Sequence, residues 1–383
     1  MVCLVRKLVY LDNSATTKPC ETAVERINNA LRENWGNPSS LHGLGIKAEQ
    51  EMNRARQAVA DLLSCRTDEI FFTSGGTEAN NIAIMGAVNA RRRRGKRIVT
   101  TSIEHSSTLE TIVTLEKQGF NVVYLKPDRS GVVAKEDIDK AITSDTILVS
   151  IMLVNNETGA IQPVKAAAEA ISRISAPAML HCDAVQAFGK MNLNPSRMGI
   201  DLMTFSAHKF HGPKGIGGLY KSKNVKIAPL TYGGGQERGL RSGTEATPLI
   251  AGMLGAIEEL PDCDKQLEIV RKLRDYAIER LKEIEGISFN SPPDALPYII
   301  NISVDGKKSE TMMHFLESRN IYVSSGSACA KGKGSHVLRS MGLSDARVDS
   351  ALRISFSKNN DYEDVDIFID ALKEGIKTLR SFK

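Results

Sequence analysis

The stretch MTFSAHKFHGPKGIGG, residues 203–218, is the most informative part of this 383-residue sequence. An apolar run ends in a small polar cluster, Lys209 follows, and the chain then turns through glycines. This order is typical of a strand that ends at a glycine-rich turn. In sheets whose strands alternate with helices, ligands bind at such strand ends.

Lys209 lies between Ser and His side chains and the glycine-rich turn. A lysine in this setting can bind an aldehyde covalently while its neighbours bind a phosphate, and enzymes hold pyridoxal 5′-phosphate (PLP) as a Schiff base in this way. The segment alone is equally compatible with a solvated loop lysine. The polar residues at other strand ends therefore decide between the two interpretations.

The centre of the sequence alternates between strand and helix patterns. Strands are predicted at residues 69–73, 97–101, 121–125, 146–153, 178–183 and 201–205, and helices after residue 77, near 108–119 and at 164–174. Strands that alternate with helices of this length predict an α/β fold with a mainly parallel sheet covered on both faces.

The pattern changes near Leu260 and Pro261. A long helix is predicted at residues 265–285, then a strand at 298–304, a helix ending near 320, strands at 321–323 and 351–357, and a C-terminal helix. Two domains are therefore expected. We expect residues 15–260 to form a large domain, which is the PLP-binding domain if Lys209 is a cofactor lysine, and residues 1–14 and 261–383 to form a smaller α+β domain, which the apolar N-terminal strand joins.

Composition excludes several classes of protein. The 50 basic and 45 acidic residues are nearly balanced, and the basic run Arg91–Arg97 has no interleaved aromatic residues, so a solvated helix-to-strand connection is favoured over direct nucleic-acid binding. No apolar run approaches the ~18 residues of a membrane span. The six scattered cysteines include no metal-type pair, so we expect no metal site, and a reduced, cytoplasmic protein.

Polar residues follow the other predicted strands in a consistent way. Thr77 follows two glycines at the start of a helix, which suits a phosphate, although a simple helix cap has the same pattern. His105, Asn156 and Asp183 each come just after a strand, and each also has an ordinary structural explanation. Together they predict a phosphate site, a ring-stacking partner, a carboxylate and a Schiff-base lysine at one sheet edge.

Longer motifs then carry a family resemblance. They are Tyr10–Thr17, Gly36–His42, Phe72–Asn81, Ile103–His105, Val154–Gly159, His181–Gln186, Ser206–Gly218, Gly233–Thr244, Ser325–Cys329 and Leu352–Ser355. The sequence resembles PLP enzymes of the class V aminotransferase family, and specifically cysteine desulfurases of the NifS/IscS type. The resemblance implies fold type I of the PLP-dependent transferases, with a large seven-stranded sheet domain and a smaller α+β domain.

The resemblance also implies a role for each motif residue. Lys209 is the Schiff-base lysine and the base at the substrate Cα, Asp183 pairs with the pyridinium nitrogen, and His105 stacks on the ring and helps to move protons. Further cofactor contacts are implied for Gly76, Thr77, Ser206 and His208 on the phosphate side and for Asn156 and Gln186 near the ring hydroxyl. Arg353, with Asn156, binds the substrate carboxylate, since arginine can pair with it bidentately. Thr244 reaches the phosphate from a neighbouring subunit, which implies a homodimer.

Cys329 is the residue that points to the reaction. It lies among serine, glycine and alanine in a segment, about 324–335, that we expect to be an exposed, flexible loop, unlike the setting of a buried structural cysteine. The resemblance implies that its thiolate takes the sulfur of L-cysteine as a persulfide and leaves alanine. The segment 330–338, AKGKGSHVL, is shorter and more basic than is usual in the family. The identity of the sulfur acceptor therefore stays open.

The sequence leaves three functions open. The first is a cysteine desulfurase that supplies sulfur to an iron–sulfur scaffold or a tRNA thiolation enzyme. The second is a selenocysteine lyase or another class V PLP enzyme. The third is a non-catalytic sulfur-transfer scaffold, which the retention of both Lys209 and Cys329 argues against.

Overall fold

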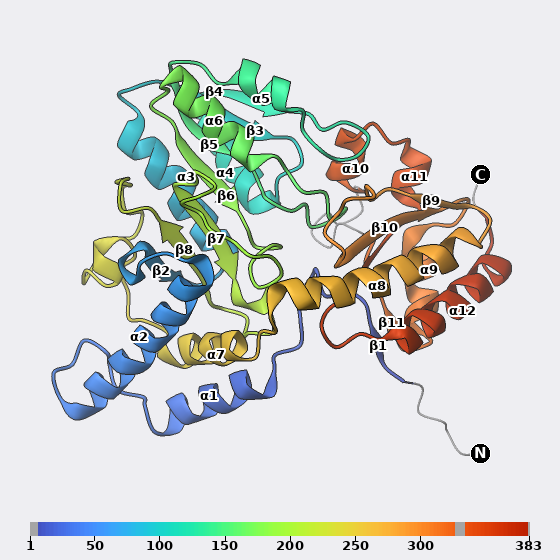
Figure 1. The fold of residues 1–383 in the computed structure, drawn as a ribbon, viewed down its shortest axis with the longest axis horizontal. Coiled ribbons are helices and arrows are strands. Elements are labelled where there is room, and N and C mark those ends of the chain that lie inside the picture. The colour runs from blue at the N-terminus through green and yellow to red at the C-terminus, as the bar shows by residue number, and fades with distance from the viewer. Residues whose placement is uncertain (1–6, 326–333, 382–383) are drawn as a thin grey trace.

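A seven-stranded sheet organises the chain between residues 70 and 221 (Figure 1). The computed structural model describes residues 7–325 and 334–381. The strands are β2 (Ile70–Thr73), β3 (Arg97–Thr101), β4 (Asn121–Leu125), β5 (Thr146–Ser150), β6 (Met179–Asp183), β7 (Leu202–Ser206) and β8 (Gly217–Lys221). Their order across the sheet is β2-β8-β7-β6-β5-β3-β4.

The sheet is mainly parallel. Strands β4, β3, β5, β6 and β7 run in one direction, and β8 pairs antiparallel with both β7 and β2. The predicted α/β fold class is confirmed. The glycines around 215–218 are predicted from the sequence only as a turn, yet Gly217 and Gly218 begin β8. A side chain at Gly218 would overlap the ring of Phe205 on the adjacent strand, so glycine is required for this pairing.

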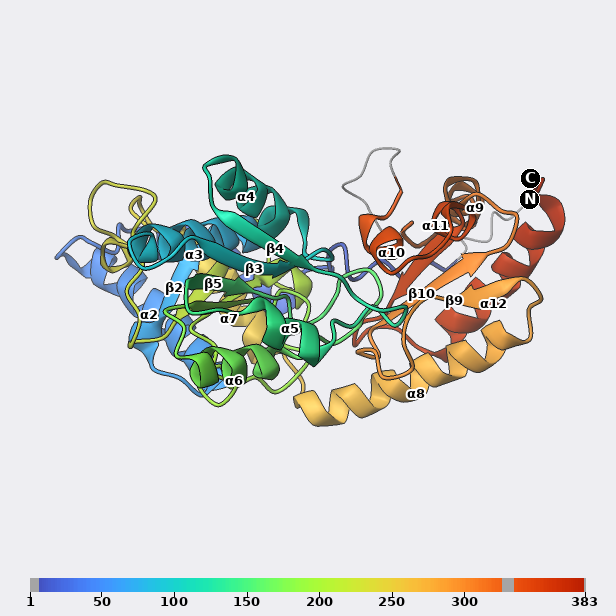
Figure 2. The same ribbon diagram turned by 90° about the horizontal axis from the view of Figure 1, so that it is seen from above.

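Helices cover both faces of this sheet, as Figure 2 shows. On one face α3 (Gly76–Arg91) and α4 (Ser106–Lys117) pack on the sheet and on each other. The other face is covered by α5 (Lys135–Ala141) and α6 (Val164–Ile174), with α1 (Glu21–Arg32), α2 (Gly43–Leu63) and α7 (Thr247–Glu258) packed beyond β2. Small residues of α3, among them Ala79, Ala83 and Ala87, are fully buried and let the helix approach the strands closely.

The remaining strands form two smaller sheets. They are an antiparallel sheet of β12 (Ala351–Ser355), β10 (Ile299–Val304) and β9 (Ile287–Phe289), and a parallel pair of β1 (Val9–Tyr10) and β11 (Ile321–Tyr322). Around them lie α8 (Cys263–Lys282), α9 (Ser309–Glu317), α10 (His336–Ser340), α11 (Asp345–Asp349) and α12 (Tyr362–Thr378). One apolar cluster is continuous from the large sheet to these elements. The domain division at residues 15 and 260 stays a prediction.

Some predicted boundaries differ from the structure. The strand predicted at 146–153 ends at Ser150, because the backbone N–H of Met152 turns to the buried carboxyl of Glu104. Helices α1, α2, α5, α7, α10 and α11 and the short strand β9 are not predicted from the sequence. The basic run Arg91–Arg97 joins α3 to β3 and is largely exposed, as a helix-to-strand connection requires. Within residues 7–325 and 334–381, no helix is long and apolar enough to cross a membrane.

Candidate active site

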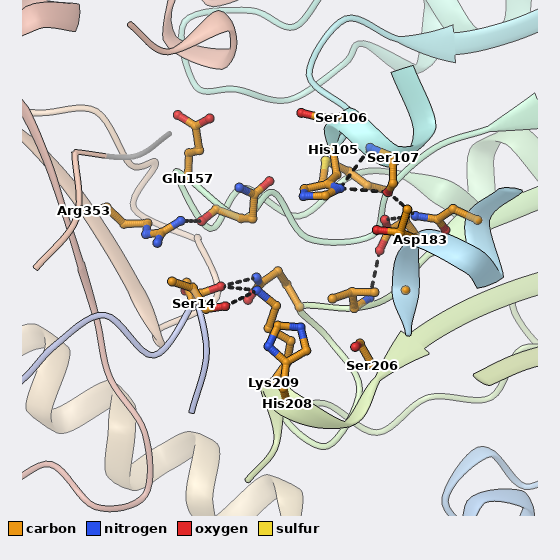
Figure 3. A pocket seen from close by; sticks show the side chains of 18 of the residues that line it. Ser14, His105, Ser106, Ser107, Glu157, Asp183, Ser206, His208, Lys209 and Arg353 are labelled. Atoms are coloured by element: carbon orange, nitrogen blue, oxygen red, sulfur yellow. Dashed lines mark hydrogen bonds between the residues drawn. The ribbon is translucent and has the colours of Figure 1, made fainter. Parts of the chain in front are cut away.

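A cavity of about 300 Å³ lies at the carboxyl ends of β3, β5, β6 and β7, beside the start of α3 (Figure 3). Among the residues that line it are these predicted ones: Gly76, Thr77, His105, Asn156, Asp183, Gln186, Ser206, His208, Lys209 and Arg353. Parallel strands bring their carboxyl ends to one edge, so residues far apart in the sequence meet there. The structure thus places these residues together, and their individual roles stay predictions.

Lys209 ends a single 3-10 turn, Ala207–Lys209, that directly follows β7. Its Nζ donates hydrogen bonds to the backbone carbonyls of Ser14 (2.6 Å) and Ala15 (2.9 Å). Two backbone carbonyls of the N-terminal segment therefore hold the Lys209 side chain in position. Sequence reasoning missed Ser14, because nothing in its local pattern indicates a contact with residue 209.

Asp183 is the last residue of β6 and is only 5% exposed. Its Oδ2 accepts a hydrogen bond from Asn80 Nδ2 (2.8 Å) and its Oδ1 accepts one from the Val185 N–H (3.0 Å). These two hydrogen bonds fix the orientation of the buried carboxyl group. Asn80 is fixed in turn, since its Oδ1 accepts from Thr204 Oγ1 and its Nδ2 also donates to Ser107 Oγ.

His105 caps the N-terminus of α4. Its Nδ1 accepts a hydrogen bond from the Ser107 N–H (3.2 Å), so the neutral ring carries its proton on Nε2. Burial lowers the pKa of His105, and the positive charge of Lys209 adds to this, although Asp183 opposes both. A neutral imidazole with a defined tautomer is the result.

The start of α3 forms a cradle at one end of the cavity. Gly75 has a φ of +151°, which L side chains rarely adopt, and a Cβ at Gly76 would lie 2.9 Å from Val185 Cγ2. Ser206 lies across from these glycines, and Thr77 is the second residue of α3, after Gly76. Exposed N–H groups at the N-terminus of a long helix, with hydroxyls beside them, suit a phosphate.

His208 and Gln186 contact the N-terminal segment. His208 Nδ1 lies 3.2 Å from Thr16 Oγ1, and burial, with the charge of Lys209 second, lowers the pKa of His208 to about 4. Gln186 Nε2 donates to the Ser14 carbonyl at 3.0 Å. His208 is therefore a neutral hydrogen-bonding group.

Arg353 enters the cavity from β12, opposite the large sheet. Its Nη2 lies 2.7 Å from Asp12 Oδ1 and its Nη1 donates to the Asn156 carbonyl at 3.0 Å. Arg353 also exchanges backbone hydrogen bonds with Ser324 (3.2 and 2.7 Å). Arg353 is only 2% exposed, and these contacts hold its guanidinium in one orientation.

Two predicted residues do not line this cavity. Thr244 is exposed and lines a separate cavity beside Glu237 and Arg241. Cys329, the predicted sulfur-accepting cysteine, lies outside the described residues. Both predictions stay open here.

Two buried carboxyl groups near the cavity were not predicted. Burial raises the pKa of Glu104 to about 8 and that of Glu157 to about 7. Glu157 lines the cavity and accepts a hydrogen bond from Ser335 Oγ (2.5 Å), and His336 lies 3.1 Å from the Glu104 carbonyl. Both carboxyls belong to motifs noted in the sequence, but only the burial in the fold distinguishes them from surface glutamates.

Comparison with known proteins identifies the family. The model of the family described as "Aminotransferase class-V" matches residues 9–368. The chain belongs to the class V aminotransferase family. Within the class V family, a "NifS/IcsS protein homolog" of Lactobacillus delbrueckii subsp. bulgaricus is 44% identical over 96% of this chain and 97% of the relative. "Cysteine desulfurase IscS" of Clostridium botulinum is 42% identical over 98% of this chain and 96% of the relative.

Solved structures agree with this class V assignment. A "NIFS-LIKE PROTEIN" superimposes with a TM-score of 0.91 and 39% identity, covering 97% of this chain and all (100%) of the other. "SspA in complex with cysteine" superimposes with a TM-score of 0.80 and 35% identity, covering 91% and 98% of the two chains. The predicted resemblance to NifS/IscS proteins is confirmed.

Proposed function

We propose that this protein is a PLP-dependent cysteine desulfurase, which converts L-cysteine to L-alanine and transfers the sulfur to Cys329 as a persulfide. The observation that carries the proposal is that Lys209, Asp183 and Arg353 meet in one cavity, at the edge where ligands bind such sheets. The names of the relatives, "Cysteine desulfurase IscS" among them, support the same activity.

The residues of the cavity fit PLP. Gly76, Thr77 and Ser206 would hold the phosphate, because a larger residue at 76 would collide with Val185 and the α3 N-terminus is favourable for an anion. Lys209 would bind the aldehyde covalently, and Asp183 would pair with the ring nitrogen. When bound, PLP supplies an electron sink that acidifies the substrate Cα–H and promotes chemistry at Cβ.

The proton-handling groups are Lys209 and His105. The amine of Lys209, released when substrate takes its place, would remove the proton from the substrate Cα and hold it against the carbonyls of Ser14 and Ala15. The neutral His105 can donate from Nε2 because its Nδ1 is occupied by Ser107. Hydrogen bonds from Asn80 and Val185 hold the Asp183 carboxyl group in place beside the cavity.

Arg353 would bind the carboxylate of the amino-acid substrate. Its Nη2 donates one hydrogen bond to Asp12 and its Nη1 donates one to the Asn156 carbonyl. These two bonds fix the plane of the guanidinium. The second hydrogen on each nitrogen can then meet a carboxylate in the bidentate geometry that lysine cannot provide. This contact orients the substrate thiol side chain relative to its Cα.

Cys329 would complete the reaction. Its thiolate attacks the substrate sulfur, the Cβ–S bond breaks, and the carbon fragment keeps the electron pair, takes up a proton and leaves as alanine. In sum, L-cysteine and the Cys329 thiol give L-alanine and a Cys329 persulfide. Ser324, whose backbone pairs with that of Arg353, precedes Cys329 by five positions in the sequence.

Three further proposals concern the dimer, the domain division and the sulfur acceptor. Thr244 lines a separate cavity and is exposed, so it would reach a phosphate only in another copy of the chain, which favours a homodimer. We also propose residues 15–260 as the large domain, because the whole seven-stranded sheet comes from within them. The persulfide would pass to a protein acceptor, such as an iron–sulfur scaffold or a tRNA thiolation enzyme.

The proposal is tested with purified protein loaded with PLP. Borohydride reduction followed by peptide mass spectrometry should place the cofactor on Lys209, and turnover with L-cysteine should release alanine. L-Selenocysteine is assayed in parallel to compare the two substrates. A protein that takes up no PLP, or whose cofactor is attached at another lysine, would contradict the proposal.

A further inference from the structure

Lys190 is a buried lysine that the proposed mechanism does not use. It is the last residue of the turn region that follows β6, residues 185–190, and is only 6% exposed. Its Nζ lies 3.3 Å from Gln186 Oε1 and 5.4 Å from the ring centroid of Tyr298. Within the described residues no carboxylate forms an ion pair with it, whereas its neighbour Lys358 pairs with Glu259 (3.4 Å).

Burying a lysine without a carboxylate is costly. Removing an ammonium from water is unfavourable unless ionic or hydrogen-bonding partners replace the water. Burial lowers the pKa of Lys190 to about 7, and the positive charges of Lys209 and Arg353 add to the effect. A methionine of similar length would avoid this cost, so stability of the fold does not explain a lysine here.

The contacts of the Gln186 side chain indicate a role for Lys190. Lys190 Nζ donates to Gln186 Oε1, so the oxygen of the amide faces the lysine. A backbone carbonyl only accepts, so the Gln186 atom that faces Ser14 is the NH₂ group, at 3.0 Å. Lys190 and the Ser14 carbonyl thus select the same orientation of the amide from opposite ends.

This orientation matters because the Ser14 carbonyl is shared. It accepts from Gln186 Nε2 and also from Lys209 Nζ at 2.6 Å. Lys190, Gln186, Ser14 and Lys209 therefore form one continuous hydrogen-bonded chain that ends at the proposed Schiff-base lysine. A flipped Gln186 amide would direct its oxygen at the Ser14 carbonyl and repel it, which would disturb the end of this chain.

We propose that Lys190 is a positioning residue of the active site, which fixes the polarity of the Gln186 amide and, through the shared Ser14 carbonyl, the position of Lys209. The inference rests on the proposed function, in which Lys209 binds PLP. It assigns Lys190 no contact with substrate or cofactor. Its consequence is a gain in PLP affinity obtained against the stability of the cofactor-free fold.

The test is a double-mutant cycle in PLP affinity. PLP-free wild type, Lys190→Met, Gln186→Leu and the double variant are titrated with PLP, and the dissociation constants are compared. We expect Lys190→Met to weaken PLP binding about tenfold, the loss expected for one well-placed hydrogen bond. In the Gln186→Leu background the same substitution should change affinity by less than about twofold. Lys358→Met is the matched control, because Lys358 lines the same small cavity as Lys190 without contacting Gln186.

A merely structural role predicts a different result. Lys190→Met should leave the thermal midpoint of the PLP-free protein unchanged or raise it, while a structural lysine would lose stability and affinity together. Lys190→Leu replaces the methionine variant if that does not fold. Equal affinity losses in both Gln186 backgrounds, or an equal loss in Lys358→Met, would overturn the proposal.

A second readout separates this proposal from the proposed function. In PLP-free protein labelled with nitrogen-15 at glutamine, hydrogen exchange of the Gln186 side-chain NH₂ should be slow, and faster in Lys190→Met. If wild type binds no PLP, the proposed function fails but this measurement still decides the orientation of Gln186. Equal exchange in both proteins would refute the positioning role of Lys190.

Discussion

Replacing Glu104 by glutamine should stabilise the protein increasingly as the pH rises. Glu104 is fully buried between β3 and α4, with its Oε1 accepting from Thr101 Oγ1 (2.7 Å) and from the Met152 N–H (2.9 Å). Its Oε2 is buried and has no hydrogen-bond partner among the described residues. Burial, with the nearby Asp183 charge as a smaller contribution, raises the pKa of Glu104 from 4.5 to about 8.

The magnitude follows from proton linkage. Above pH 4.5 the unfolded chain releases this proton, while the folded protein keeps it until about pH 8. Each pH unit in this window costs wild type about 1.4 kcal/mol of unfolding free energy, a cost that glutamine does not have. The stability of Glu104→Gln relative to wild type should therefore grow by about 4 kcal/mol between pH 5 and pH 8.

Urea denaturation of PLP-free wild type and variant at pH 5, 6.5 and 8 measures this difference. Titration of all other groups is common to both proteins and cancels. Glu110→Gln is the matched control for the loss of one carboxyl group, because Glu110 is exposed on α4 and lacks the burial on which the prediction for Glu104 depends. A difference for Glu104→Gln that is the same at pH 5 and pH 8 would refute the reasoning.

Other substitutions test single contacts of the site. Asn80→Leu removes the hydrogen bond to buried Asp183 and should lower the unfolding free energy by about 2–3 kcal/mol in urea denaturation, so a change below about 0.5 kcal/mol would count against the contact. Arg353→Lys should raise the KM for L-cysteine at least tenfold in steady-state kinetics, while the absorbance of bound PLP stays unchanged; an unaltered KM would remove Arg353 from substrate binding. Lys209→Ala should give no borohydride-stable cofactor adduct by mass spectrometry, and an adduct at another lysine would contradict its role.

Much of the site could be predicted because chemistry recurs at strand ends. Lys209, Asp183 and His105 each follow an apolar run, and the rule that parallel strands end at one edge places them together without a structure. The α/β class follows from the same alternation. Strand β8 was not predicted, because Gly218 is required by the neighbouring Phe205 ring, a contact that no local pattern shows.

The supporting residues could not be predicted because their partners are distant in sequence. Asn80 and Asp183 are separated by 103 positions, and Ser14 and Lys209 by 195. Lys190 resembles any surface lysine until the fold buries it, and Glu104 resembles an ordinary acidic residue beside a histidine. Local pattern identifies groups that face a ligand, whereas the groups that hold them depend on tertiary packing.

A single-turnover reaction of PLP-loaded protein with L-cysteine is the most direct test of sulfur transfer to Cys329. The reaction is stopped without reductant, alanine is quantified, and the peptide that contains Cys329 is weighed by mass spectrometry. We expect one alanine for each Cys329 that gains one sulfur atom, and neither product in Cys329→Ser. Alanine formed without added sulfur on Cys329, or formed equally by Cys329→Ser, would contradict this expectation.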